Sequence, residues 1–306
     1  MALSNFLQML DIQLTLVLFL FIGILCYQFK IITDESRPSF MKLLLNIFLP
    51  IMVFNSFSKI TIELLQLSLI AVVVGTIIYI IIAVISPLLY KKYNSDKRPI
   101  LEYATLVNNA GFAGLPLVTS IFGDAGAIIG SVYLVPHRIF TWTVGLQIYE
   151  RSSETNIKDA FIKLMKNPSI IAVVLGLVRG LLSIPLPDFM DRGFASIASA
   201  VQPMAMIVIG SVIAKVDYKS LIEPGIIKYC VIRLIVIPLI VLGVMKLLQM
   251  DPVLTGVVTI MAGMPAGTPT PILAAQYDLN VPFAAKLTFV SIMLSVITSP
   301  ILMLFV

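Results

Sequence analysis

The chain has 306 residues, of which 59% are hydrophobic and 12% are charged, and its mean hydropathy is +1.03. Soluble domains carry about 25% charged residues, so this composition excludes an ordinary soluble protein and predicts an all-α integral membrane protein. The formal net charge of +5 does not indicate nucleic-acid binding, because the basic residues lie in short connections between apolar runs.

A helix needs about 20 mainly apolar residues to cross a bilayer. The chain contains ten such segments, at 10–29, 38–57, 64–90, 100–122, 125–148, 168–186, 194–214, 224–248, 253–276 and 282–305. The first segment lacks both a preceding basic region and a following cleavage site, so we expect a retained helix rather than a signal peptide. The charged connection 149–167 has room for a short surface helix. Cys26 and Cys230 lie inside apolar runs, so no structural disulfide is expected.

The distribution of Lys and Arg predicts the orientation of the chain. The odd-numbered connections contain fourteen basic residues: Lys30, Arg37, Lys42, Lys91, Lys92, Lys97, Arg98, Arg151, Lys158, Lys163, Lys166, Lys215, Lys219 and Lys228. The even-numbered connections contain three, namely Lys59, Arg192 and Lys246. By the positive-inside rule the odd connections are cytoplasmic and both termini are extracytoplasmic. We expect a multi-pass protein of the cell (plasma) membrane.

Two halves of the chain share a pattern. The tetrapeptide AGLP at 113–116 is echoed by AGTP at 266–269, and Pro50 is echoed by Pro203 at the same offset. These matches predict two five-helix repeats, 1–153 and 154–306. Because five is odd, the second repeat must enter the membrane from the opposite side, which makes the repeat inverted.

The predicted helices 4 and 9 contain helix-breaking residues at their centres. Proline removes a backbone donor and glycine weakens a helix, so neither segment is expected to be continuous. Paired breaks in inverted repeats indicate the midplane binding site of a secondary transporter, where half-helix N-termini favour an anion. The candidate substrate-binding residues at the breaks are Asn108, Asn109, Gly111, Gly114, Pro116, Gly263, Pro265, Gly267, Thr268, Pro269 and Thr270. The alternative is a pair of kinks that only ease helix packing.

A third matched pair lies in predicted helices 2 and 7. Asn46 with Pro50 and Gln202 with Pro203 are candidates to face the substrate from the other side. The alternative is a proline kink accompanied by a polar helix–helix hydrogen bond.

Among the basic residues in or at the ends of apolar segments, four are candidates for ion coupling: His137, Arg138, Arg233 and Lys286. Charges at membrane depth are costly and usually functional. His137 is the only histidine and therefore the natural proton-coupling candidate; the alternative is an interior polar contact or a position at the cavity rim. Arg233 and Lys286 could instead extend to the membrane interface, and Arg138 could complement the second carboxylate of a dicarboxylate. The acidic residues all fall in connections or near helix ends, which argues against cation antiport.

The segments NNAGFAGLPL, LLLNIFLPIMVF and GMPAGTPTPILAAQYD resemble the auxin efflux carrier family in its bacterial branch, which includes malate and malonate permease-like members. The resemblance covers essentially the whole chain. It implies the fold of bile-acid symporters and sodium/proton antiporters, with helices 1, 2, 6 and 7 as a scaffold and helices 3–5 and 8–10 as a mobile transport domain. It also implies that Asn109, seven residues before Pro116, contacts a substrate carboxylate. The plant pattern has proline where this chain has Asn108, and the long central loop of the plant members is absent; both departures argue against auxin itself.

The sequence therefore predicts a secondary active transporter of small organic anions, such as malate, malonate or auxin-like acids, working by an elevator-type mechanism. The alternatives are an ion-coupled carrier of another substrate, such as a bile-acid-like steroid or an amine, and a passive channel or receptor. A membrane enzyme is disfavoured because the chain lacks a His/Glu cluster or paired buried acids. No cofactor, metal or nucleic acid is expected. The coupling ion, proton or sodium, and a homodimeric state stay open.

Overall fold

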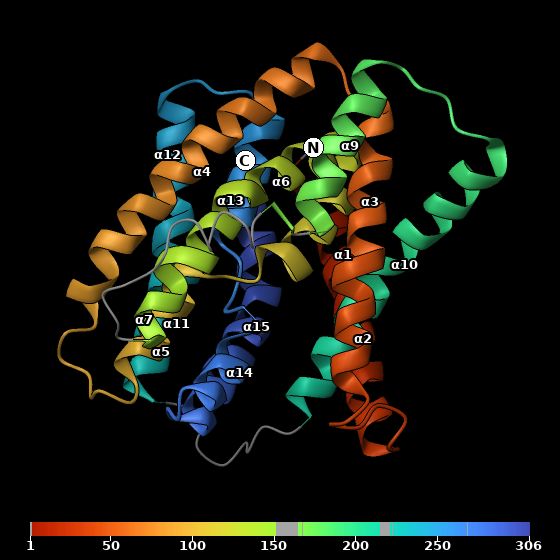
Figure 1. Ribbon diagram of the computed structural model, residues 1–306. Coiled ribbons are helices and arrows are strands. Elements are labelled where there is room, and N and C mark those ends of the chain that lie inside the picture. The colour runs from red at the N-terminus through yellow and green to blue at the C-terminus, as the bar shows by residue number, and fades with distance from the viewer. Residues whose placement is uncertain (1, 151–164, 167, 215–220, 222, 268) are drawn as a thin grey trace.

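The computed structural model describes residues 2–150, 165–166, 168–214, 221, 223–267 and 269–306. Within these ranges the regular structure is helical, and the one β feature is an isolated antiparallel bridge between Asn108 and Ala266. Figure 1 shows the helices gathered into a single body with α6 at its centre. The predicted surface helix in the 149–167 connection lies almost entirely outside the described residues.

The first part of the chain forms α1 (Ala2–Gln28), α2 (Arg37–Leu43), η1 (Leu44–Phe48), α3 (Leu49–Ser56), η2 (Phe57–Lys59), α4 (Ile62–Leu89), α5 (Arg98–Leu106), η3 (Ala110–Gly114), α6 (Leu115–Phe140), η4 (Thr141–Gly145) and α7 (Leu146–Glu150). The second part forms α9 (Pro168–Leu181), α10 (Asp188–Ile213), α11 (Pro224–Val231), η6 (Ile232–Val236), α12 (Ile237–Leu247), α13 (Pro252–Ala262), α14 (Pro269–Gln276) and α15 (Val281–Met303). Helices therefore lie in each of the ten predicted segments.

Six helical stretches of the described chain are long and apolar enough to cross a membrane: Arg37–Ser56, Ile62–Leu89, Ala110–Phe140, Asp188–Val212, Pro224–Leu247 and Val281–Met303. The third of them is two helices joined at Gly123, whose φ of 60° and ψ of −140° interrupt α6. Such a backbone conformation suits glycine, which has no Cβ to clash. The interruption falls between the predicted helices 100–122 and 125–148.

Three π-helical segments precede a proline near the start of the next helix. Pro50 follows η1, Pro116 follows η3 and Pro238 follows η6. A proline ring clashes with the carbonyl four residues earlier and cannot donate to it. The wider π-turn accommodates this local disruption without ending the helix.

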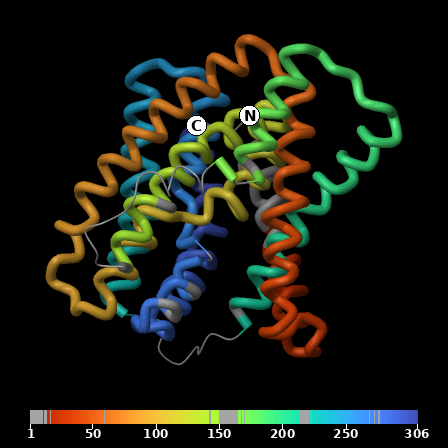
Figure 2. Tube along the Cα trace, viewed as in Figure 1, coloured from red at the N-terminus to blue at the C-terminus, as the bar shows by residue number. Residues whose placement is uncertain are grey.

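The helices fall into two groups in Figure 2, with α1–α3, α9 and α10 on one side and α4, α5 and α11–α15 on the other. Within the first group, α1 and α10 pack so closely that only glycine fits at two positions. A Cβ on Gly23 would collide with the backbone of Ile207, and a Cβ on Gly210 would collide with the backbone of Leu20. The η2 segment packs similarly on α9, where Gly176 faces Phe57.

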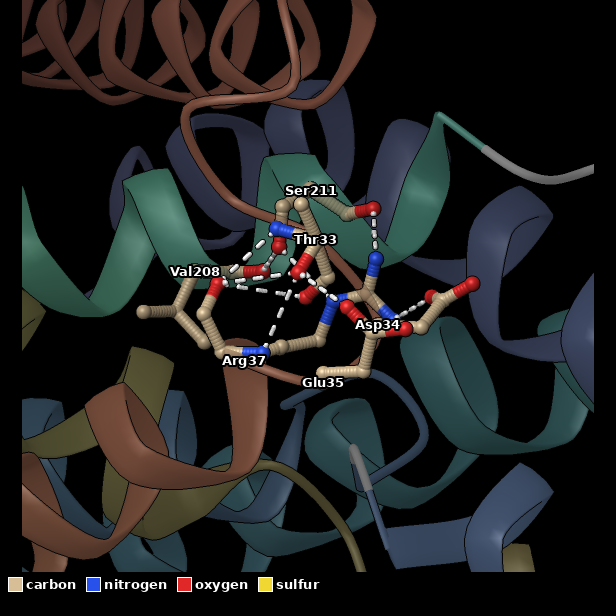
Figure 3. A network of polar contacts seen from close by, with 7 residues as sticks. Thr33, Asp34, Glu35, Arg37, Val208 and Ser211 are labelled. Atoms are coloured by element: carbon tan, nitrogen blue, oxygen red, sulfur yellow. Dashed lines mark hydrogen bonds and ion pairs between the residues drawn. The ribbon is translucent and has the colours of Figure 1, made fainter.

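A polar network joins the connection between α1 and α2, and the first residue of α2, to the last turns of α10 (Figure 3). Arg37 donates from Nε to Ser211 Oγ (3.0 Å) and from Nη2 to the Ser211 carbonyl (2.9 Å), and it pairs with Asp34 at 2.8 Å. Its guanidinium also lies over the ring of Tyr27. Because the carbonyls in the last turn of a helix lack intrahelical partners, Arg37 caps α10.

Candidate functional site

The two breaks predicted from the sequence meet at the antiparallel bridge between Asn108 and Ala266, which we call the crossing. Helix α5 ends at Leu106 and α13 ends at Ala262. Beyond these ends, Asn109 N donates to the Pro265 carbonyl (2.8 Å) and Gly267 N donates to the Val107 carbonyl (3.3 Å). This two-stranded crossing satisfies backbone groups that would otherwise be unpaired inside a membrane.

Asn108 joins the two halves through its side chain. Its Nδ2 donates to the carbonyl of Met261, 153 residues further along the chain, at 2.6 Å. Its Oδ1 has no hydrogen-bond partner among the described residues, although the side chain is buried. The Nδ2 of Asn108 therefore joins the two halves, whereas its Oδ1 is a buried acceptor without a partner among the described residues.

His137 supports the crossing from α6. Its Nε2 lies 3.1 Å from the carbonyl of Asn108, so this nitrogen carries the proton and donates it. The ring packs edge-on against Tyr79 of α4, with 5.6 Å between centroids. His137 is thus buried beside the break and contacts it directly.

Ser291 of α15 supports the other strand of the crossing. Its hydroxyl oxygen accepts a hydrogen bond from Ala266 N at 3.2 Å. The crossing is therefore held from both sides by side chains that bond to its backbone, His137 on one and Ser291 on the other.

Arg233 joins the C-terminal ends of the two half-helices. The residue lies in η6 and its exposed fraction is 0%. Its Nη1 donates to the carbonyl of Thr105 (2.9 Å), in the last turn of α5, and its Nε donates to the carbonyl of Met264 (3.2 Å), just after α13. These carbonyls belong to the negative ends of helix dipoles. Arg233 is buried at the crossing instead of extending to the surface.

A cavity of about 130 Å³ lies against the crossing. Its walls come from the crossing, from α6 and from the α2–α3 region: Leu45, Leu49, Val107, Asn108, Asn109, Gly111, Phe112, Leu134, His137, Arg138, Thr141, Gly267 and Pro269. A Cβ placed on Gly111 would meet no atom within 4 Å, so this glycine leaves open space at the wall. The cavity combines amide and cationic groups with an apolar lining.

Asn109 lines the cavity and has a buried donor available. Its side chain is 2% exposed, and its Nδ2 has no partner among the described residues. Asn109 also lines a smaller cavity of about 30 Å³ shared with Met264 and Pro265. A buried amide donor without a partner costs free energy, and an anionic acceptor would remove that cost.

The structure brings most of the predicted site residues to the crossing. Gly114 packs against Met261 and Met264, Gly263 packs against Pro238, and the buried Thr270 has a hydroxyl without a partner among the described residues. Pro116 is buried at the start of α6. Thr268 lies outside the described residues.

Other predicted residues lie away from the cavity wall. Asn46 is exposed, and its neighbours Leu45 and Leu49 line the cavity in its place. Gln202 accepts a hydrogen bond from Ser120 (2.9 Å) where α10 meets α6. Pro50 is buried in α3, and Pro203 is half-buried in α10.

Lys286 lies in a charged cluster at the ends of helices. Its Nζ is 3.9 Å from Glu223, which also pairs with Lys97 at 2.7 Å. Nearby, Asn280 donates a hydrogen bond to Asp96 (3.0 Å), and this bond lowers the pKa of that partly buried carboxyl. The cluster joins three connections and does not contribute to the crossing.

Tyr79 and Ser291 were not identified from the sequence. Each lies in an ordinary apolar segment. Their partners at the site are distant in the sequence: Tyr79 contacts His137, and Ser291 bonds to Ala266. The only sequence signal is that polar side chains in very apolar helices tend to face the protein interior.

Comparison with known proteins identifies the family. The model of the family described as membrane transport protein matches residues 10–303. The chain belongs to this family. The resemblance to the auxin efflux carriers, which fall within the family, is confirmed.

Several relatives of the family cover almost the entire chain. An uncharacterized transporter from Methanocaldococcus jannaschii is 22% identical over 92% of this chain and 94% of its own length. One from Methanothermobacter thermautotrophicus is 21% identical over 94% of this chain and 95% of its own length. The uncharacterized transporter YfdV of Escherichia coli K12 is 23% identical, with 94% of both chains covered. The chain is therefore a multi-pass membrane transport protein.

Proposed function

We propose that the protein is a secondary active transporter of small organic anions, with carboxylates such as malate, malonate or auxin-like acids as substrates. The observation that carries this proposal is the buried amide of Asn109: the residue lines the cavity beside the crossing, and its Nδ2 donor has no partner among the described residues. A carboxylate oxygen at this donor would gain a hydrogen bond in a site shielded from water.

The cavity supports a small substrate. Pockets for drug-sized molecules are about 300–1,000 Å³, whereas this cavity is about 130 Å³. A short carboxylic acid suits the space better than a steroid does. Arg138 also lines the cavity and is placed to meet the second carboxylate of a dicarboxylate.

Pairs of contacts related by the repeat offset support two inverted five-helix halves. Asn108 bonds to Met261, 153 residues away. Two glycine contacts show the same offset. Gly23 contacts Gly210, and Gly176 contacts Phe57. Gly176 lies 153 residues after Gly23, and Gly210 lies 153 residues after Phe57, so the offset converts one contact into the other. A shift that exchanges two observed contacts is what an approximate two-fold axis requires.

We propose an elevator-type motion between a scaffold of α1–α3, α9 and α10 and a transport domain containing the crossing. The position of these helices toward opposite sides of the molecule in Figure 2 supports this division. The Ser120–Gln202 hydrogen bond would join the two domains in the described conformation and break when they move. His137, bonded to the crossing itself, is the candidate for coupling transport to a proton.

The test is uptake and counterflow of labelled monocarboxylates and dicarboxylates in proteoliposomes, with imposed pH or sodium gradients. We expect saturable carboxylate flux, and a His137→Gln variant that loses any acceleration by a proton gradient while still performing counterflow. Protein-free vesicles are the control. Absence of saturable flux for every carboxylate tested would refute the proposed substrate class.

A further inference from the structure

A second and larger cavity lies between the last turns of α4 and the η6–α12 segment. Its volume is about 190 Å³. Ile81, Ile85 and Leu89 line it from α4, and Ile232, Val236 and Ile240 line it from the other side. This cavity shares no wall residue with the one at the crossing. Its walls are almost entirely hydrocarbon, which favours an aliphatic occupant.

The cavity lies along the outside of two membrane-crossing segments, Ile62–Leu89 and Pro224–Leu247. The side chains at its rim are strongly exposed, with 60% exposure at Ile240 and 50% at Ile81. In a membrane, such a surface meets the acyl chains of lipids. The cavity is therefore a groove that opens toward the bilayer.

One end of the groove carries a concentration of basic and aromatic side chains. Leu89, the last residue of α4, lines the groove, and its carbonyl accepts a hydrogen bond from Lys228 at 2.5 Å. Three lysines and two tyrosines lie at or directly after this end: Tyr90, Lys91, Lys92, Tyr93 and Lys228. Lysines and tyrosines at a helix end characterise the level of lipid headgroups, and clustered lysines attract anionic ones.

We propose that the groove binds one acyl chain of an anionic glycerophospholipid, whose headgroup lies at Lys91 and Lys92. Both lysines are exposed, so they can meet a phosphate at the surface while the chain runs along α4. The groove also reaches Thr105, whose carbonyl accepts a hydrogen bond from Arg233. The bound chain therefore packs against the end of one half-helix of the crossing. This inference does not depend on which substrate is carried.

The test uses a tryptophan at the rim of the groove and lipids with brominated acyl chains, which quench its fluorescence on contact. Trp142, the single native tryptophan, is replaced by Phe. Ile240→Trp then reports on the groove. Val84→Trp is the matched control, because Val84 is similarly exposed (65%) on α4 but does not line the groove. Vesicles of phosphatidylcholine contain a minor fraction of brominated phosphatidylglycerol or brominated phosphatidylcholine.

We expect brominated phosphatidylglycerol to quench Ile240→Trp several-fold more than brominated phosphatidylcholine, and both lipids to quench Val84→Trp equally. Adding Lys91→Gln and Lys92→Gln should remove the difference at Ile240→Trp. Equal quenching by both lipids at Ile240→Trp would overturn the proposed site. A preference that survives loss of both lysines would overturn the headgroup assignment. Ile81→Trp, on the opposite rim, replaces Ile240→Trp if that variant does not fold.

Discussion

Replacing Arg233 with Met tests whether this residue joins the ends of the two half-helices. The substitution keeps an unbranched apolar chain but removes the donors that bond to the carbonyls of Thr105 and Met264. A hydrogen bond from a charged group contributes about 1.5–3 kcal/mol. Losing two, and leaving two buried carbonyls unpaired, should lower the free energy of unfolding by about 3–6 kcal/mol. Arg233→Lys keeps the charge but cannot reproduce the forked geometry, so about half of this loss is expected.

Thermal unfolding in detergent measures this effect through the thiol of Cys230. That side chain is buried, at 4% exposed, and reacts with a thiol-specific fluorophore once the fold opens. Cys26 is replaced by Ala in every variant, so that the signal comes from one thiol. Arg192→Met is the control, because Arg192 is an exposed arginine. If Arg233→Met unfolds at the same temperature as Arg192→Met, Arg233 does not hold the crossing together.

Two further predictions concern the cavity and the charged cluster. Gly111→Ala places a methyl group in the open space at the cavity wall. We expect weaker substrate binding, measured as a raised KM for uptake, with little change in the unfolding temperature. The control Gly243→Ala, in α12, should change neither the KM nor the unfolding temperature. Equal KM values for the two variants would contradict the cavity assignment. Because the pKa of Asp96 is lower in the folded than in the unfolded protein, this carboxyl stabilises the fold at any pH above its unfolded-state pKa. The stabilisation is lost as the pH falls through the folded-state pKa. In Asp96→Asn, the unfolding temperature should therefore fall less steeply on the acid side, by a small amount because Asp96 is only partly buried and solvent screens it. An unchanged pH profile would refute this contribution.

The position of the crossing could be predicted from local chemistry. Clustered prolines and glycines weaken a helix, so the groups of them around Gly111 and Pro265 predict the two breaks, whereas single prolines such as Pro87 and Pro203 stay inside helices. The offset between AGLP and AGTP also predicted that the two breaks correspond. The structure adds a direct bond between the halves, from Asn108 to Met261 at the same offset.

The partners of individual side chains could not be predicted, because they depend on how distant helices pack. Arg233 was a candidate for either an interior or a surface role, and only its contacts with Thr105 and Met264 decide between them. Asn46 matched the proline pattern of helix 2, but its neighbours Leu45 and Leu49 occupy the face toward the cavity. Hydropathy alone does not set the rotation of a helix about its axis when its apolar residues extend all round it.

The central claim is that the amide of Asn109 binds a carboxylate at the crossing, and Asn109→Asp tests it most directly. This substitution keeps the shape of the side chain and replaces the buried donor with an anionic acceptor. Uptake of the preferred labelled carboxylate is measured in proteoliposomes for wild type, Asn109→Asp and Asn109→Gln, with equal incorporation of protein and equal unfolding temperatures as controls. We predict at least a tenfold loss of carboxylate uptake in Asn109→Asp, equivalent to about 1.4 kcal/mol or more of binding free energy, and a smaller loss in Asn109→Gln. Wild-type uptake by Asn109→Asp would contradict the claim.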